Sequence, residues 1–220
     1  MSKKIFSILA IFTFYSFTIA AQVQVNKEPR HKKTIENKYM RVLDVWIKPG
    51  DTTLFHIHST PSLFLHFTNT VVCSQEKGKA WVRGENKEGN ASYRSFVNDT
   101  LVHRVSNCDT VPFHVTDIEI LAPYKSTTQL NPLPFTVLFE NEKAFAYRLT
   151  SSSFNNKIIS NRGPMIAELI AGSEITFHDS LNKKSTTIKA GKYLYINSGT
   201  SFYFSATGNE EINLVIFEIK

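Results

Sequence analysis

The chain has 220 residues, of which 42% are hydrophobic, and carries a formal net charge of +6 at pH 7. This apolar content supports a sizeable core, in one large or two small domains, and excludes an intrinsically disordered chain. The one basic cluster, 27–33, is expected to be a solvated tail, so we expect no nucleic-acid partner.

The first 21 residues differ from the rest. Lys3 and Lys4 precede an uncharged apolar run of 17 residues that ends in Ala20 and Ala21. A basic start, a short apolar stretch and small residues at its end are typical of a secretory signal peptide. A retained anchor is the alternative, because 17 residues reach the lower limit of spanning length. We expect cleavage and therefore an exported protein, periplasmic or secreted, without a stable membrane anchor.

Residues 22–34 are expected to form a polar leader, and short β-rich runs follow it. These runs are dense in Val, Ile, Phe, Tyr and Thr and are separated by turn residues such as Pro49-Gly50. No long stretch keeps a helical period. The strands expected in the first half lie at 40–47, 52–57, 63–68, 71–74, 79–82, 93–97 and 115–121.

The segment 123–133 is rich in proline and polar residues and is expected to be a linker. Beyond it the strand pattern resumes, and its landmarks repeat those of the first half: Pro61 corresponds to Pro164, and His103 to Phe202. The strands expected there lie at 135–139, 144–149, 167–170, 186–188, 193–196, 202–204 and 212–219. The sequence therefore predicts an all-β chain with an internal repeat.

His56 and His58 are separated by one residue in an expected strand. Side chains two apart on a strand point to the same face, so both imidazoles are directed into one pocket. An exposed pair of histidines on a strand edge is the alternative. A third histidine, His103, with Asn107 four residues later, favours the pocket.

Together these residues resemble the two motifs of the cupin superfamily. The matching positions are Gly50, His56, His58, His103 and Asn107. The Glu of the first motif is replaced by Ser62, and its last Gly by Asn69, which tolerates a positive φ. The resemblance implies two tandem cupin-type jelly-roll barrels: a metal-binding barrel at 35–122 and a second barrel at 134–220.

The resemblance also implies that His56, His58 and His103 bind a divalent transition metal inside the first barrel. The identity of the metal is left open among Fe, Mn, Ni and Zn, which all accept imidazole ligands. Three neutral imidazoles leave the full charge on the ion, so its water becomes more acidic and an anionic ligand is favoured.

Three further residues are expected to line the cavity or to lie behind the ligands: Ser62, His66 and Asn107. His66 shares strand parity with Ser62, although a single histidine is more often a satisfied buried group. The same applies to His114. His31 lies in the expected leader and His178 in the second half, and neither is expected at the site.

The second barrel keeps the turns of the first but not its ligands. Ile159, Asn161 and Phe202 stand where the three histidines stand, and Met165 stands where Ser62 stands. Apolar groups at these positions predict a packed core, so we expect a degenerate cupin barrel without a metal.

Cys73 and Cys108 are 35 residues apart, and either a disulfide or two free thiols fits the sequence. For function, the cupin resemblance implies a dioxygenase-like metalloenzyme that acts on a small molecule. Non-catalytic metal or ligand binding and a sugar isomerase are the alternatives, because fold does not fix function. The sequence also leaves open whether two chains pair through exposed sheets to form a homodimer.

Overall fold

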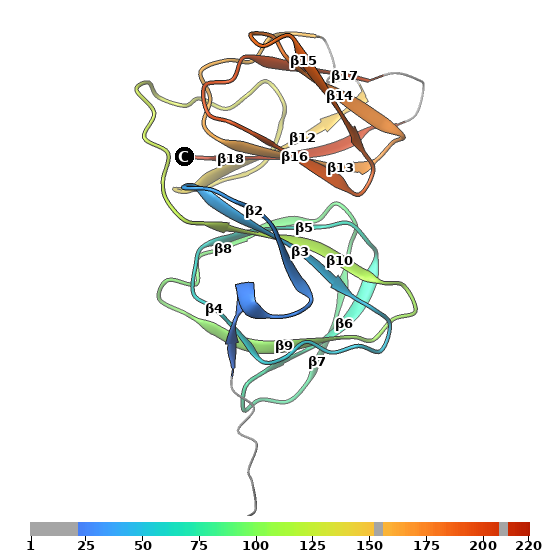
Figure 1. The fold of residues 1–220 in the computed structure, drawn as a ribbon. Helices are drawn as coiled ribbons and strands as arrows, with labels where there is room; N and C mark the ends of the chain where they lie inside the picture. Colours follow the sequence, from blue (N-terminus) through green and yellow to red (C-terminus); the bar gives the residue numbers. More distant parts are fainter. Residues whose placement is uncertain (1–21, 152–155, 207–210) are drawn as a thin grey trace, which may run out of the picture.

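The computed structural model describes residues 22–151, 156–206 and 211–220, and the signal peptide expected at 1–21 lies outside them. The described chain is built from β-strands joined by turns, with a short 3₁₀ helix at Val25–Lys27. The strands form two barrels, one above the other in Figure 1. No helix within these ranges has the length and hydropathy needed to cross a bilayer.

The N-terminal barrel consists of two five-stranded sheets. The β9 sheet contains, in spatial order, β1 (Val23–Gln24), β4 (His56–His58), β9 (Leu101–Asn107), β6 (Thr70–Glu76) and β7 (Val82–Asn86). The β10 sheet contains β2 (His31–Glu36), β3 (Met40–Ile47), β10 (Phe113–Ile120), β5 (Ser62–His66) and β8 (Ala91–Arg94).

The C-terminal barrel is also made of two sheets. The β18 sheet contains β11 (Thr136–Glu140), β12 (Ala144–Thr150), β18 (Asn213–Ile219), β13 (Met165–Ala171) and β16 (Lys192–Ile196). The smaller β14 sheet contains β15 (Lys184–Lys189), β14 (Glu174–Asp179) and β17 (Phe202–Ala206).

The two barrels repeat one topology. The order β2-β3-β10-β5-β8 in the first corresponds strand for strand to β11-β12-β18-β13-β16 in the second. The pairing of His56 with His103 in the first barrel recurs as the bridge between Ile159 and Phe202 in the second. The all-β tandem jelly-roll fold predicted from the sequence is therefore confirmed.

Residues 22–34, for which the sequence predicted a polar leader, are built into the N-terminal barrel. β1 runs parallel to β4, with Val23 opposite His56, and β2 pairs with β3. The chain between them buries Val25 and Glu28, each 2% exposed. This segment therefore lies directly beside the strand that carries two of the three histidines.

The barrels pack against each other through the outer faces of the β10 and β18 sheets. Aliphatic side chains from both sheets form one buried cluster there, which includes Met40, Leu63 and Ile118 from the first barrel and Ala146, Ile166 and Phe217 from the second. The interior of the C-terminal barrel is filled, and its core contains Ile159, Met165 and Phe202. Apolar side chains therefore occupy the positions of two metal ligands, as the sequence predicted for a packed second barrel.

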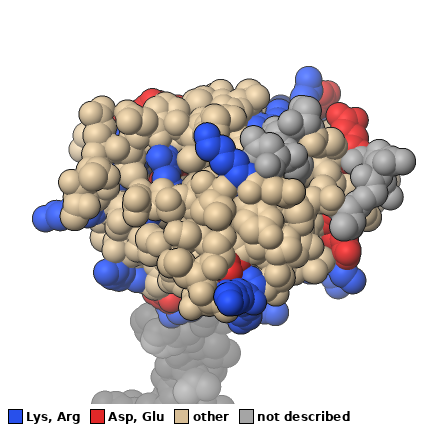
Figure 2. Space-filling view, turned by 90° about the horizontal axis from the view of Figure 1, so that it is seen from above, with Lys and Arg blue, Asp and Glu red and all other residues tan. Residues whose placement is uncertain are grey.

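Seen from above the C-terminal barrel, Lys and Arg are scattered over the surface and acidic side chains lie near the rim (Figure 2). Most of this face is uncharged. Its visible part shows no dense cluster of one sign of charge.

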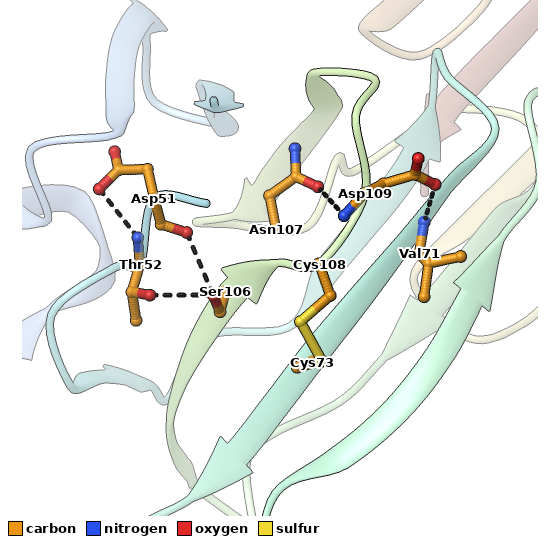
Figure 3. Close-up of a disulfide and its surroundings, with 8 residues drawn as sticks. All are labelled: Asp51, Thr52, Val71, Cys73, Ser106, Asn107, Cys108 and Asp109. Atoms are coloured by element: carbon orange, nitrogen blue, oxygen red, sulfur yellow. Dashed lines mark hydrogen bonds between the residues drawn. A yellow bond between two sulfur atoms is a disulfide. The ribbon is translucent and has the colours of Figure 1, made fainter. Parts of the chain in front are cut away.

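A disulfide joins Cys73 on β6 to Cys108, which directly follows β9, with a Cα–Cα distance of 5.9 Å (Figure 3). Hydrogen bonds surround it: the Asp109 carboxylate accepts from the Val71 backbone N–H at 2.9 Å, and Asn107 Oδ1 accepts from the Asp109 N–H at 2.9 Å. The bond thus fixes the end of the strand that carries His103. The structure favours the paired form of the two cysteines over the free thiols.

Replacing both cysteines, as in C73S/C108S, should lower the free energy of unfolding by roughly 3 to 4 kcal/mol, because the cross-link restricts the unfolded chain. Urea unfolding monitored by tryptophan fluorescence measures the loss. Reduction of the wild-type protein should give a similar shift. Equal stability of the oxidised, reduced and double-Ser proteins would contradict a structural disulfide.

Glu168 on β13 is a buried acid at the interface between the barrels, 0% exposed, and neither of its oxygens makes a hydrogen bond of ordinary length within the described part of the chain. Burial raises the pKa of its carboxyl from 4.5 to about 8; the negative charge of Asp44 adds to the rise, and Thr116 offsets part of it. At neutral pH the folded protein therefore keeps Glu168 protonated.

This shift predicts that stability decreases as the pH rises from about 4.5 to about 8. In this window the unfolded chain releases the Glu168 proton while the folded chain retains it, whereas below 4.5 both keep it. Over this pH range the free energy of unfolding of E168Q should decrease by at least about 1 kcal/mol less than that of the wild type, since one pKa unit corresponds to about 1.4 kcal/mol. Chemical unfolding at several pH values tests this, and an unchanged slope in E168Q counts against it.

Candidate metal centre

The pairing of β4 with β9 brings the three histidines together. His56 lies directly opposite His103, and His58, two residues along β4, faces the same side. One ring nitrogen from each of the three lies within 4.8 Å of the others. The Nε2 atoms of His58 and His103 are 3.2 Å apart.

Each of the three rings has a polar group near Nδ1. His56 Nδ1–H donates to the Leu54 carbonyl at 2.9 Å, and the Ser74 hydroxyl, which can accept, lies 3.2 Å from His103 Nδ1. The Asp117 carboxylate lies 3.4 Å from His58 Nδ1. The Leu54 carbonyl can only accept and so fixes the proton of His56 on Nδ1, whereas His58 Nδ1 makes no hydrogen bond among the described residues and Asp117 is the nearest group to it.

The histidines are neutral at physiological pH. Burial, together with the neighbouring imidazoles, lowers the pKa of His56 to about 4, of His103 to about 3 and of His58 to about 2. Neutral rings are the form that binds transition metals. At 3.2 Å the two Nε2 atoms share a hydrogen bond when one ring carries its proton there, and when both lone pairs are free they can share a cation, so this set of three imidazoles fits a divalent metal.

The histidines face a cavity of about 220 Å³ inside the N-terminal barrel. Its walls are mainly apolar, with Val45, Phe64, Val72 and Phe113 among them. A second hollow, which shares His58 and His103 with the cavity, is lined by residues of the β8–β9 region: Ser92, Tyr93, Arg94, Phe96 and Leu101. The site is therefore enclosed on most sides and continues into the β8–β9 hollow.

No protein-family model and no curated protein sequence matches this chain. Among solved structures, the protein Ylba from E. coli is similar over 91% of this chain and 87% of its own, with a TM-score of 0.62 and 8% identity. A cupin 2 conserved barrel domain protein from Leptotrichia buccalis is similar over 86% and 88%, with a TM-score of 0.53 and 8% identity. The chain has the cupin fold.

The salicylate 1,2-dioxygenase from Pseudaminobacter salicylatoxidans is similar over 82% of this chain and 71% of its own, with a TM-score of 0.54 and 12% identity. At this identity the similarity concerns the cupin fold and not the reaction. The chemistry of this protein must therefore be argued from its own side chains.

Of the three neighbours predicted for the cupin site, only His66 lines the cavity. Burial lowers its pKa to about 4, and it lies outside the cluster of three nitrogens. Ser62 is fully buried, and its hydroxyl donates to the Thr60 carbonyl at 3.2 Å. The Asn107 amide donates to the carbonyls of Ile47 and Val111, each at 2.9 Å, and so holds the turn after β9.

His114 lies outside the cavity, as a satisfied histidine. Its ring stacks between Trp46 and Phe67, with centroid distances of 3.8 and 4.4 Å, and its Nε2 lies 2.8 Å from the Asp44 carboxylate.

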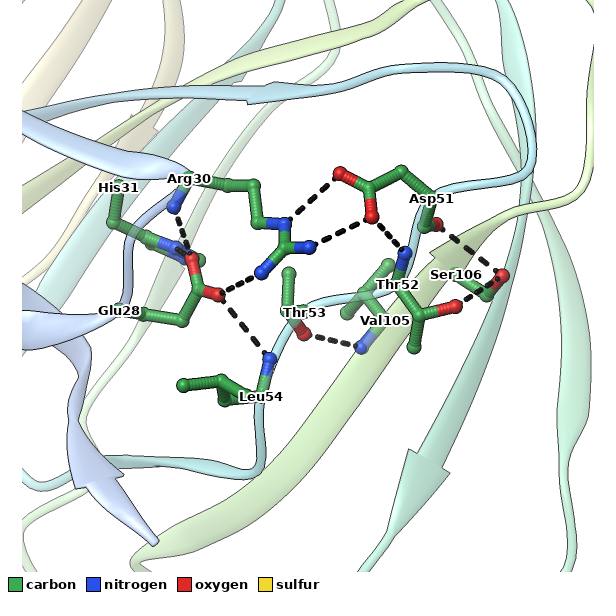
Figure 4. Close-up of polar contacts among 9 residues, drawn as sticks. All are labelled: Glu28, Arg30, His31, Asp51, Thr52, Thr53, Leu54, Val105 and Ser106. Atoms are coloured by element: carbon green, nitrogen blue, oxygen red, sulfur yellow. Dashed lines mark hydrogen bonds and ion pairs between the residues drawn. The ribbon is translucent and has the colours of Figure 1, made fainter.

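Sequence reasoning missed His31, which lines the cavity from β2. Its ring lies 4.7 Å from that of His56, and its Nδ1 is 2.9 Å from the Glu28 carboxylate (Figure 4). The basic cluster around it suggested a solvated tail. The only signal in the sequence is the Glu28-x-x-His31 spacing, which does not by itself locate the pair beside His56.

Glu28 connects this segment to the strand that carries the ligands. Its carboxylate accepts hydrogen bonds from the backbone N–H groups of Arg30 and Leu54 as well as from His31, and it pairs with the Arg30 guanidinium (Figure 4). Arg30 in turn forms a bidentate pair with Asp51. Burial alone would raise the pKa of Glu28, but these hydrogen bonds outweigh it and lower the pKa to about 2.

E28Q should destabilise the protein by about 2 kcal/mol at pH 7, because a buried, multiply bonded carboxylate is removed. With a folded pKa near 2 against 4.5 unfolded, Glu28 stabilises the protein above pH 4.5 and loses this effect as the pH falls toward 2. The stability of E28Q should therefore decrease less than that of the wild type when the pH falls from 4.5 toward 2. D51N, at a partly exposed position, serves as the control and should lose under about 1 kcal/mol.

Proposed function

We propose that this protein is an exported cupin that binds one divalent transition metal through Nε2 of His56, His58 and His103 and acts on a small molecule in a dioxygenase-like reaction. The observation that carries the proposal is the convergence of three neutral imidazoles on one cavity. His56 and His103 have a partner at the outer nitrogen, and Asp117 lies 3.4 Å from that of His58.

A bound transition metal would supply a Lewis-acid centre with coordination positions left for a substrate oxygen and for dioxygen. The protein itself contributes the side chains that surround the metal site. Val72, Phe64 and Phe113 exclude bulk water from the cavity, and its volume of about 220 Å³ suits a molecule of the size of a small aromatic acid.

The hollow beside the metal site favours an anionic substrate. The Arg94 guanidinium lies 4.8 Å from the centre of the Phe96 ring, and Phe96 stacks on His58 at 5.0 Å. A positive group outside the three neutral ligands attracts a carboxylate toward the ion. The fold shared with salicylate 1,2-dioxygenase is consistent with this substrate class.

Export is part of the proposal. It is supported by the basic and apolar character of the first 21 residues and by the Cys73–Cys108 disulfide, since disulfides persist in oxidising compartments.

Metal binding without catalysis is the second candidate. It is favoured by one observation: within the described ranges, no carboxylate joins the cluster of three ligand nitrogens. A metal site of that kind could serve to bind a ligand.

Metal analysis of the purified protein tests the proposal. We expect one equivalent of transition metal per chain in the wild type, and a loss of at least about tenfold in H56A/H58A, because a single remaining histidine is a weak ligand. H178A changes a histidine of the C-terminal barrel, whose ring nitrogens contact Ser185 and Ser205, and should keep the metal. A wild-type protein that stays metal-free after reconstitution contradicts the proposal.

Oxygen uptake with a panel of small aromatic acids, enols and thiols separates the two candidates. Metal-dependent uptake that disappears in H56A/H58A identifies an oxygenase. Stoichiometric metal without turnover of any of these substrate classes favours the non-catalytic protein.

A further inference from the structure

Asp117 on β10 is a buried acid that faces the metal cavity. It is 1% exposed, it lines the cavity, and neither of its oxygens makes a hydrogen bond of ordinary length among the described residues. Its Oδ2 lies 3.4 Å from Nδ1 of His58. A buried carboxyl group without a full partner is costly, so a fold that keeps one needs a reason for it.

The position of Asp117 is related to the missing carboxylate of the first cupin motif. That carboxylate is expected at residue 62, where this chain has a small serine on β5. β5 and β10 are paired, and Asp117 lies opposite Phe64, two residues from Ser62. Asp117 is thus a diagonal neighbour of Ser62 across the strand pair. The short serine side chain leaves room for the carboxyl group to approach from the neighbouring strand.

The second barrel provides an internal comparison. There Met165 pairs with Glu218 as Ser62 pairs with Glu119, so Ile216 occupies the position of Asp117. The four positions in the first barrel are His56, His58, His103 and Asp117, and their counterparts in the second are Ile159, Asn161, Phe202 and Ile216. A carboxyl group is therefore present at this position in the barrel that has the three histidines and absent from the barrel that lacks them.

We propose that Asp117 is the carboxylate of this metal centre: a positioning residue that accepts the Nδ1 hydrogen of His58 and keeps Nε2 of that ring directed at the metal. The inference rests on the proposed metal binding. A carboxylate behind a histidine ligand fixes the tautomer and the orientation of the ring and increases its basicity. Asp117 acts through His58, because its oxygens lie outside the cluster of three ligand nitrogens.

The test compares zinc affinity, measured by competition with a chromophoric chelator at pH 7, in the wild type and three variants. D117I reproduces the residue of the second barrel and should weaken zinc binding by about 10 to 100-fold. D117N keeps the shape and one acceptor oxygen but cannot ionise when the metal binds, and should have an intermediate affinity. E119Q removes another buried acid from the same strand, one that pairs with Arg41, and should stay within about threefold of the wild type.

A spectroscopic measurement separates positioning from a general effect on the fold. In ¹⁵N-detected NMR of the zinc-free protein, His58 should be protonated at Nδ1, and this proton should shift in D117N but not in E119Q. The electronic spectrum of the cobalt-substituted protein should change in D117N as well. If D117I does not fold, which near-UV circular dichroism shows, D117N decides.

Wild-type zinc affinity in the folded D117I and D117N variants, or an equal loss in E119Q, would overturn the role of Asp117. Failure of the wild type to bind zinc, cobalt or manganese would instead overturn the proposed function. The bond between His58 and Asp117 could still be established in that case from the Nδ1 proton of the metal-free protein.

Discussion

The antiparallel pairing of β4 with β9 is the constraint on which the site depends. It places His56 opposite His103 and directs His58 to the same face, so the three ring nitrogens meet without any contribution from a loop. The second barrel uses the same pairing to bring Ile159 against Phe202, and there it forms part of a packed core. The backbone therefore sets where the side chains meet, and their chemistry decides whether a cavity or a core results.

An unfilled cavity that holds several buried imidazoles is destabilising for a small barrel, so other parts of the molecule have to supply the stability. The buried apolar cluster inside the N-terminal barrel is small, with Val25, Leu43, Val45, Ile47, Phe113 and Val115 as its buried members. The C-terminal barrel has a filled interior, and the aliphatic interface between the barrels covers the outer face of the β10 sheet. The second barrel thus stabilises the sheet that carries Asp117, consistent with the exchange of stability for function common at active sites.

Strand positions could be predicted where residues alternate or are β-branched, as in β3 and β18. β2 was missed because four of its six residues, His31-Lys-Lys-Thr-Ile-Glu36, are exposed at a sheet edge, so its composition is typical of a solvated tail. The ligands followed from strand parity and motif spacing. His31 and Asp117 did not, since β2 and β10 bring them to the cavity through tertiary contacts, and β10 is buried along its whole length.

Asp117 and Glu28 occupy similar positions relative to the cavity. Each carboxyl group is buried, each lies beside the Nδ1 of a histidine that lines the cavity, and each comes from a strand or segment outside the β4–β9 pair. Glu28 is bonded to Nδ1 of His31 at 2.9 Å, and Asp117 lies 3.4 Å from Nδ1 of His58. A carboxyl group behind a ring favours the tautomer with the proton on Nδ1, which leaves Nε2 as an acceptor. Neutral imidazoles would bind a divalent cation without compensating its charge. The remaining positive charge would then favour an anion as a further ligand.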